Sequence, residues 1–225
     1  DVSPNTALTY LDCGSNQLTS LDVSGATALT NLSCYNNNLT LLDVSSNLAL
    51  TYLDCNSNQL TLIDVSSNLA LTQLYCNSNQ LTSLDVSNNL ALINLSCGYN
   101  LLTSLDVSNN LALTYLSCEY NLLTSLDVSN NLTLVWLVCG DNQLTSLDLR
   151  NGNNTNFFDF NATNNPTLTC ISVDDPVWAD TNWTSIDPVS LFSGNCYCSY
   201  MDNDYIDDVY STNVSCNGGD DGTIY

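Results

Sequence analysis

The chain has 225 residues, is 44% hydrophobic, and carries 23 acidic residues against one basic residue, for a formal net charge of −22 at pH 7. That hydrophobic content can bury a core, so we expect a folded chain rather than a disordered one. Nucleic acid and anionic membranes are excluded as partners, because both are bound through clustered Lys or Arg. No apolar run reaches the roughly 18 residues that a membrane span needs, so no membrane insertion is predicted.

A 21-residue repeat dominates the chain. The first unit reads Leu8-x-x-Leu11-x-Cys13-x-x-Asn16-x-Leu18 and continues with Leu21-Asp22-Val23-Ser24. Its cysteine returns every 21 residues, at Cys13, Cys34, Cys55, Cys76, Cys97, Cys118 and Cys139. A fixed period of this length is typical of solenoids, in which each unit stacks on its neighbours. The chain opens inside this pattern at Asp1-Val2-Ser3 without an initiator Met or signal peptide, so we expect a processed or partial chain.

The spacing within each unit predicts its structure. Leu and Cys at alternate positions place both side chains on one face of a short strand, and the Asn can bond backbone groups of the turn that follows. The strands then form a parallel sheet with a spacing of about 4.8 Å. The returning Leu-Asp-Val-Ser segment is too short for a full helix and should cross the convex side as an extended or single-turn piece.

The C-terminal third departs from the repeat. After Leu149 the rhythm slips by two residues, and Phe157, Phe160, Ala162 and Asn165 take the Leu, Leu, Cys and Asn positions of an irregular eighth unit. We therefore expect a solenoid over 1–167, with about eight units of 21 to 23 residues and an incomplete first unit. An irregular C-terminal cap follows over 168–198, in which the aromatic segment 178–192 closes the core. The remainder, 199–225, is an acidic tail or the first strand of an Ig-like module.

Three segments resemble known families. The repeats are similar to the leucine-rich repeats of bacterial surface proteins, in particular the 21-residue, cysteine-bearing internalin J type. The cap, with Cys170-Ile171-x-Val173 and Cys196, resembles the closing region of secreted leucine-rich proteins of Bacteroidota. The segment 212–224 resembles the opening of the SprB-type repeat of gliding-motility adhesins. Together these resemblances imply a leucine-rich-repeat solenoid with little helix, a short β tail, and a secreted or cell-surface binding role.

The eleven cysteines fall into two groups. The seven repeat cysteines could be metal ligands or a redox relay, but their spacing places one in the core of each strand, where we expect buried and unreactive thiols. The other four, Cys170, Cys196, Cys198 and Cys216, are an even set in a protein expected to be exported, and they are predicted to form disulfides. We prefer a Cys170–Cys196 bridge in the cap, which leaves Cys198 to pair with Cys216.

An aspartate also recurs in every unit. This Asp ladder comprises Asp22, Asp43, Asp64, Asp85, Asp106, Asp127 and Asp148. Like charges one strand apart repel, so either the carboxylates accept hydrogen bonds from the backbone of the turn or cations lie between them. We favour the capping role, and calcium is the alternative because it prefers carboxylate and carbonyl oxygens. No other cofactor is predicted.

Aromatic side chains are predicted on the concave face, at strand positions that point away from the core. The candidate ligand-binding residues are Tyr35, Tyr52, Tyr75, Tyr115 and Trp136, together with Tyr99 and Tyr120 at the strand ends. Exposed aromatics among amides and carboxylates suit sugar stacking or a protein hot spot. The alternative is that Tyr simply favours sheet positions and packs against its neighbours across the strands.

The sequence therefore predicts a non-enzymatic extracellular adhesion module that binds a protein or a glycan. It has no His or Lys for the commonest catalytic roles, and its paired carboxylates lie on an open sheet. Eight Asn-x-Ser/Thr sequons would suit a glycoprotein, although a chain this rich in Asn, Ser and Thr contains many by chance. The alternative function is a structural subunit of an extracellular filament, in which an open N-terminal edge meets the C-terminal strand of another copy.

Overall fold

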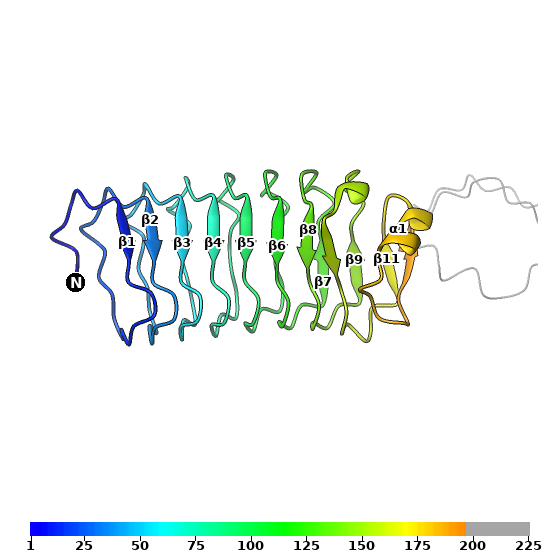
Figure 1. Cartoon of the computed structure of the whole chain (residues 1–225), viewed down its shortest axis with the longest axis horizontal. Coiled ribbons are helices and arrows are strands. Elements are labelled where there is room, and N and C mark those ends of the chain that lie inside the picture. The colour runs from blue at the N-terminus through cyan, green and yellow to red at the C-terminus, as the bar shows by residue number, and fades with distance from the viewer. Residues whose placement is uncertain (197–225) are drawn as a thin grey trace, which may run out of the picture.

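The computed structural model describes residues 1–196 and shows an elongated stack of parallel strands (Figure 1). Eight three-residue strands form sheet A. They are β1 (Tyr10–Asp12), β2 (Asn31–Ser33), β3 (Tyr52–Asp54), β4 (Gln73–Tyr75), β5 (Asn94–Ser96), β6 (Tyr115–Ser117), β8 (Trp136–Val138) and β10 (Asp159–Asn161). The predicted solenoid with a parallel sheet and little helix is confirmed, and it makes about nine turns.

The register of sheet A follows the 21-residue period. Leu11 lies opposite Leu32, Leu32 opposite Leu53, and the same alignment continues to Leu137 opposite Phe160. These central residues point into the core, where each buried Leu contributes about 1.5–3 kcal/mol relative to an exposed one. The residues on either side of them point outward, so only alternate strand positions are free to vary in chemistry.

An Asn that follows each strand of sheet A from β2 to β8, buried in most units, ties successive units together. The side-chain amide of Asn100 donates to the carbonyls of Cys76, Cys97 and Gly98, and its Oδ1 accepts from the backbone N–H of Leu81. The equivalent residues Asn37, Asn58, Asn79, Asn121 and Asn142 make the same bonds in their own units. The predicted role of this Asn at the turn is confirmed, and it also bonds the preceding unit.

A second Asn ladder lies beside the returning segments and was not predicted. Its members are Asn47, Asn68, Asn89, Asn110 and Asn131, all fully buried. Asn89, for example, donates from Nδ2 to the carbonyls of Val65 and Asn68, while its Oδ1 accepts no hydrogen bond. The units that contain these five residues therefore carry two amide bridges to the unit before them.

The returning segments form a second sheet near the C-terminal end of the solenoid. This sheet B contains β7 (Ser125–Asp127), β9 (Ser146–Asp148), β11 (Cys170–Ser172) and β12 (Leu191–Ser193), in the order β12, β11, β9, β7. The extended conformation was one of the two expected, but the pairing into a sheet was not. Strand β11 aligns Ile171 with Leu147, so the segment 168–173, predicted as the start of the cap, is paired as the returning half of a repeat.

The irregular unit fills the positions predicted for it. Phe160 lies opposite Leu137, Ala162 is fully buried, and the Asn165 amide donates to the carbonyls of Cys139 and Ala162. The extra residues are accommodated in a single 3-10 turn, η1 (Asn154–Asn156), ahead of β10. The Phe and Ala substitutions thus preserve the inward positions of the strand although the spacing changes.

The cap begins with the short helix α1 (Pro176–Asn182). Asp175 accepts hydrogen bonds from the N–H groups of Val177 and Trp178, and Pro176 occupies the first turn, where no donor is needed. The helix delivers Trp183 onto the end of the core, where its ring lies 4.4 Å from that of Phe160. The aromatic segment therefore closes the core as predicted.

A disulfide joins Cys170 in β11 to Cys196, with 5.7 Å between their Cα atoms. It connects the last turn of the solenoid to the chain that leaves the cap, and it is the pair preferred on sequence grounds. Cys198, Cys216, and the tail predicted to start the Ig-like module lie outside the described residues. Within residues 1–196, no helix has the length and apolar character to cross a membrane.

The repeat cysteines from Cys34 to Cys139 are buried, as predicted, whereas Cys13 is half-buried because β1 has a neighbouring strand on one side only. Burial raises the pKa of Cys55, Cys97 and Cys139 to about 12. Because the thiolate is the reactive form, these thiols are poor nucleophiles and poor metal ligands at neutral pH.

Candidate functional site

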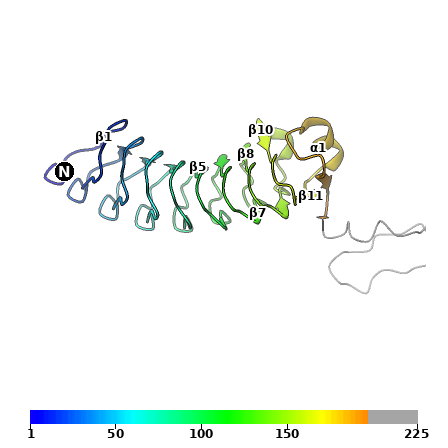
Figure 2. The ribbon, with the colours of Figure 1, turned by 90° about the horizontal axis from the view of Figure 1, so that it is seen from below.

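Sheet A forms a shallow concave surface along the molecule (Figure 2). Its first outward row runs through Tyr10, Asn31, Tyr52, Gln73, Asn94, Tyr115, Trp136 and Asp159, as the strand register aligns them. The inward positions beside this row are Leu in every strand except β10. Within these strands, the residue type therefore varies mainly at the outward positions, which solvent and ligands can reach.

A hollow of about 350 Å³ opens over the first three strands. It is lined by Tyr10, Asp12, Asn31, Ser33, Tyr35, Tyr52 and Asp54. The Tyr35 ring lies against Gly14, where an added Cβ would come within 2.3 Å of the ring. Partial burial and the neighbouring Asp54 raise the pKa of Tyr52 to about 12. Burial also raises the pKa of Asp54, although its hydrogen bonds to the Asn56 backbone and Tyr52 act in the opposite direction.

Two further aromatic contacts follow along the concave face. Tyr52 and Tyr75 have ring centroids 5.6 Å apart, and Tyr115 and Trp136 have centroids 5.8 Å apart. The Tyr75 hydroxyl is held in place, since it donates to Gln73 and accepts from the Asn94 amide. The structure thus brings Tyr35, Tyr52 and Tyr75 together in one group and Tyr115 with Trp136 in another.

Tyr99 and Tyr120 lie elsewhere, in the turns at the carboxyl edge of sheet A. Their rings stack with centroids 4.2 Å apart, and both residues have positive φ, 54° and 52°. The other units place Ser, Asn or Asp at this position, which suits a left-handed backbone better than Tyr. The nearby carboxylate of Asp141, together with Tyr99, raises the pKa of Tyr120.

Sequence reasoning missed two leucines beside this tyrosine pair. Leu101 and Leu122 follow Tyr99 and Tyr120 by two residues and are 47% and 38% exposed. The same position holds a polar residue in the other five regular units: Gln17, Asn38, Gln59, Gln80 and Gln143. Comparing the units at that position would have revealed them. The name edge patch is used below for Tyr99, Leu101, Tyr120 and Leu122.

The Asp ladder has the capping geometry that was favoured. From Asp22 to Asp127, each Oδ1 accepts from the backbone N–H of the serine two residues later, at 2.9–3.0 Å. Asp148 accepts instead from the backbone and side chain of Arg150. The serine hydrogen bonds lower the pKa of Asp43, Asp64 and Asp85. No group of three or more acidic, Cys or His side chains in residues 1–196 is placed to hold a metal ion.

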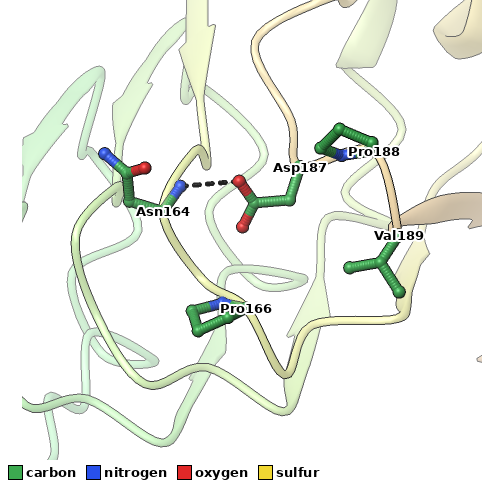
Figure 3. Close-up of a pocket in the computed structure, with 5 residues that line it drawn as sticks. All are labelled: Asn164, Pro166, Asp187, Pro188 and Val189. Atoms are coloured by element: carbon green, nitrogen blue, oxygen red, sulfur yellow. Dashed lines mark hydrogen bonds between the residues drawn. The ribbon is translucent and has the colours of Figure 1, made fainter.

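A second hollow, of about 490 Å³, lies on the cap side of the turn edge. Figure 3 shows its lining residues, Asn164, Pro166, Asp187, Pro188 and Val189, with the Asn164 backbone N–H directed at the Asp187 carboxylate. That hydrogen bond is 2.9 Å long, and the Asn164 amide donates onward to Asp141 at 3.0 Å. The hollow therefore continues the turn edge beyond the edge patch.

The inward Leu ladder, the Asn turns and the parallel sheet define the chain as a leucine-rich-repeat solenoid. Several solved structures share this fold, and one of them also has a cysteine ladder. The functional domain of InlJ from Listeria monocytogenes, which includes a cysteine ladder, is 42% identical with a TM-score of 0.63. The match covers 78% of this chain and 42% of that chain, so this chain spans less than half of the InlJ domain.

Other solved structures extend the comparison. Internalin C2 from Listeria monocytogenes is 26% identical with a TM-score of 0.65, over 72% of this chain and 74% of that chain. A leucine-rich-repeat protein of Leptospira interrogans, 21% identical, has a TM-score of 0.68 over 85% of this chain and 56% of its own, and it shows the shared fold. Scans against protein-family models and curated proteins find no match. The structural neighbours thus include internalin-type proteins.

Proposed function

We propose that this chain is a non-enzymatic, extracellular binding module that recognises a protein through the concave face of sheet A. The observation that carries the proposal is the division of the strands of sheet A into inward positions that are Leu in all strands but β10 and outward positions rich in Tyr, Trp, Asp and Asn. Aromatic side chains supply large contact area at low entropic cost, and rigid solenoids present such surfaces without rearrangement. The likeness to internalin-type proteins supports an exported adhesion role.

The test is binding of the full chain to arrays of extracellular proteins and of glycans, followed by variants on each face. Tyr115→Ala with Trp136→Ala removes two concave rings and should weaken binding tenfold or more. Leu41→Ser with Leu62→Ser is the matched control, since it removes two exposed side chains from the side of the returning segments. Circular dichroism should be unchanged for both. Full affinity in the concave variant would move the site elsewhere.

A glycan ligand is the other outcome of these arrays, because Tyr and Trp faces also stack on sugars. The filament alternative stays a prediction, since the C-terminal strand that it requires lies outside the described residues. Electron microscopy of the native chain tests it directly. Regular filaments would favour the structural role, and dispersed single solenoids would favour the binding module.

A further inference from the structure

The edge patch differs in sequence from the same turn in the other regular units, and the same difference occurs in two units. In two consecutive units the turn reads Tyr-Asn-Leu, at 99–101 and 120–122, where the units at 57–59 and 78–80 read Ser-Asn-Gln. All four substituted side chains are exposed, Tyr99 by 50% and Tyr120 by 46%. Since every unit has the same backbone there, the core does not require these residues. Large apolar side chains on an exposed edge are a cost to solubility that a binding role would explain.

The four side chains form one surface because adjacent units are bonded directly at this point. The Tyr99 N–H donates to the Glu119 carbonyl at 2.9 Å, and the Asn100 N–H donates to the Tyr120 carbonyl at 3.1 Å. The tyrosine rings stack as a result. The Glu119 carboxylate occupies the space beside Gly98, where an added Cβ would come within 2.8 Å of it. The patch is thus a rigid platform of two rings and two aliphatic side chains.

Acidic groups border this platform. The Asn121 N–H bonds the Asp141 carbonyl, which places Asp141 one unit beyond Tyr120, and the Asp141 carboxylate is oriented by the Asn164 amide. Glu119 lies on the other side, with its carboxylate held by the Ser117 hydroxyl. The chain's single basic side chain, Arg150, pairs with Asp148 and so does not neutralise this edge. Beyond Asn164, Pro188 and Val189 line the apolar hollow of Figure 3.

We infer that the edge patch binds a protein segment carrying a Lys or Arg flanked by apolar residues, with the cation against the Asp141 carboxylate and the face of the Tyr120 ring that is not stacked on Tyr99. A cation is attracted to the face of a tyrosine ring with a carboxylate beside it, and it is also attracted to a chain of net charge −22. Leu101 and Leu122 offer neither a π-face nor a hydrogen bond to a sugar, so they favour apolar side chains. The inference rests on the proposed function, protein binding, and specifies the chemistry of the partner.

The test uses the chain's own repeat as its control. The variant Tyr99→Ser, Leu101→Gln, Tyr120→Ser, Leu122→Gln restores in two units the turn found at 57–59 and 78–80, so it should fold with an unchanged melting temperature or a slightly higher one. A phage library of random peptides is panned against the full wild-type chain and against this variant. Peptides enriched only on wild type should contain Lys or Arg beside aliphatic or aromatic residues.

A synthetic peptide from that selection should bind the variant at least tenfold more weakly than wild type. The substitution Asp141→Asn should weaken binding of the peptide severalfold. Raising NaCl from 50 to 500 mM should weaken binding of the peptide to wild type by a similar factor. Enriched peptides without basic residues, no enrichment on wild type over the variant, or equal affinity for both would overturn the inference. So would a glycan whose binding is lost in the variant and insensitive to salt.

The concave-face variant and the edge-patch variant test the proposed function and the inference separately. A protein found on the arrays that requires Tyr115 and Trp136 but binds the edge-patch variant fully would leave the proposed function standing and refute the inference for that partner. A partner that binds both variants with wild-type affinity would refute both.

Discussion

At the scale of the residue, the fold depends on short Asn and Asp side chains. These side chains form hydrogen bonds with backbone N–H and C=O groups in the turns. The Asn100 amide satisfies three carbonyls and one N–H, all buried. The Asp ladder does the same for the returning segments on the exposed side. Since each unsatisfied buried group costs about 1–3 kcal/mol, the buried Asn positions are as restrictive as the leucines.

The Asp ladder predicts a specific response to acid. The pKa of Asp64 and Asp85 is lowered by hydrogen bonds from Ser66 and Ser87, so each carboxylate stabilises the fold above its unfolded value of about 3.9. That contribution is lost as the pH falls through the lower pKa of the folded state. Asp64→Asn with Asp85→Asn keeps an acceptor but removes the titration. The melting temperature of wild type should therefore fall more steeply than that of the variant below about pH 4.

Melting curves from pH 7 to 2.5 measure this difference. Ser66→Ala with Ser87→Ala is the control, because it keeps both carboxylates and removes the hydroxyl donors that make the larger contribution to the shift. It should shift the acid limb part of the way toward that of the Asn variant. Parallel curves for wild type and the Asn variant would contradict the stabilising role of the charge.

At the scale of the element, the cap seals one end of a core that would otherwise be open. Trp183 contacts Phe157, Phe160, Trp178 and Phe192, which come from the last units and from both sides of the cap. The Cys170–Cys196 disulfide fixes the exit of the chain to β11. Helix α1 is too short to be stable alone, so the cap depends on these contacts.

Loss of that disulfide should destabilise the cap. A bridge that closes a loop of 26 residues is worth roughly 2–4 kcal/mol, and Cys170→Ser with Cys196→Ser should lose about that much in urea unfolding followed by tryptophan fluorescence. Dithiothreitol should bring wild type to the level of the variant. Detection of free Cys170 in unreduced digests of the native protein would contradict the bridge.

The strands of sheet A could be predicted from sequence because inward Leu and Cys recur with one period, and Phe160 and Ala162 are still apolar residues at the expected spacing. Sheet B could not be predicted from sequence, because Ser125-Leu126-Asp127 has the same composition as earlier returning segments that form no strand. Aromatic positions were predicted, but their grouping depends on ring orientation. Leu101 and Leu122 were overlooked because leucine is the commonest core residue of the repeat.

At the scale of the whole molecule, charge opposes the packing. The chain has a formal charge of −22, and within the rod the Asp ladder places a carboxylate in each regular unit. Repulsion between exposed charges is screened within about 10 Å at 0.1 M salt. The stability of the rod should therefore depend on ionic strength more than that of a protein with balanced charge.

Raising NaCl from 10 to 500 mM should increase the melting temperature by several degrees through screening. Sodium and calcium compared at equal ionic strength separate screening from binding. An additional increase with calcium, reversed by EDTA, is expected if the Asp ladder holds the ion. Equal curves would restrict the ladder to capping, and a melting temperature that falls with NaCl would contradict the importance of repulsion.

The identical register of successive strands also fixes the distances between surfaces along the molecule. The hollow over β1 to β3 and the edge patch beside β5 and β6 are separated by a whole number of strand spacings, each about 4.8 Å. Insertion or deletion of one complete unit between them would change their separation by one such step and leave both surfaces intact. Recombination between near-identical repeats would thus adjust the reach of a two-point contact in discrete increments, without redesigning either contact.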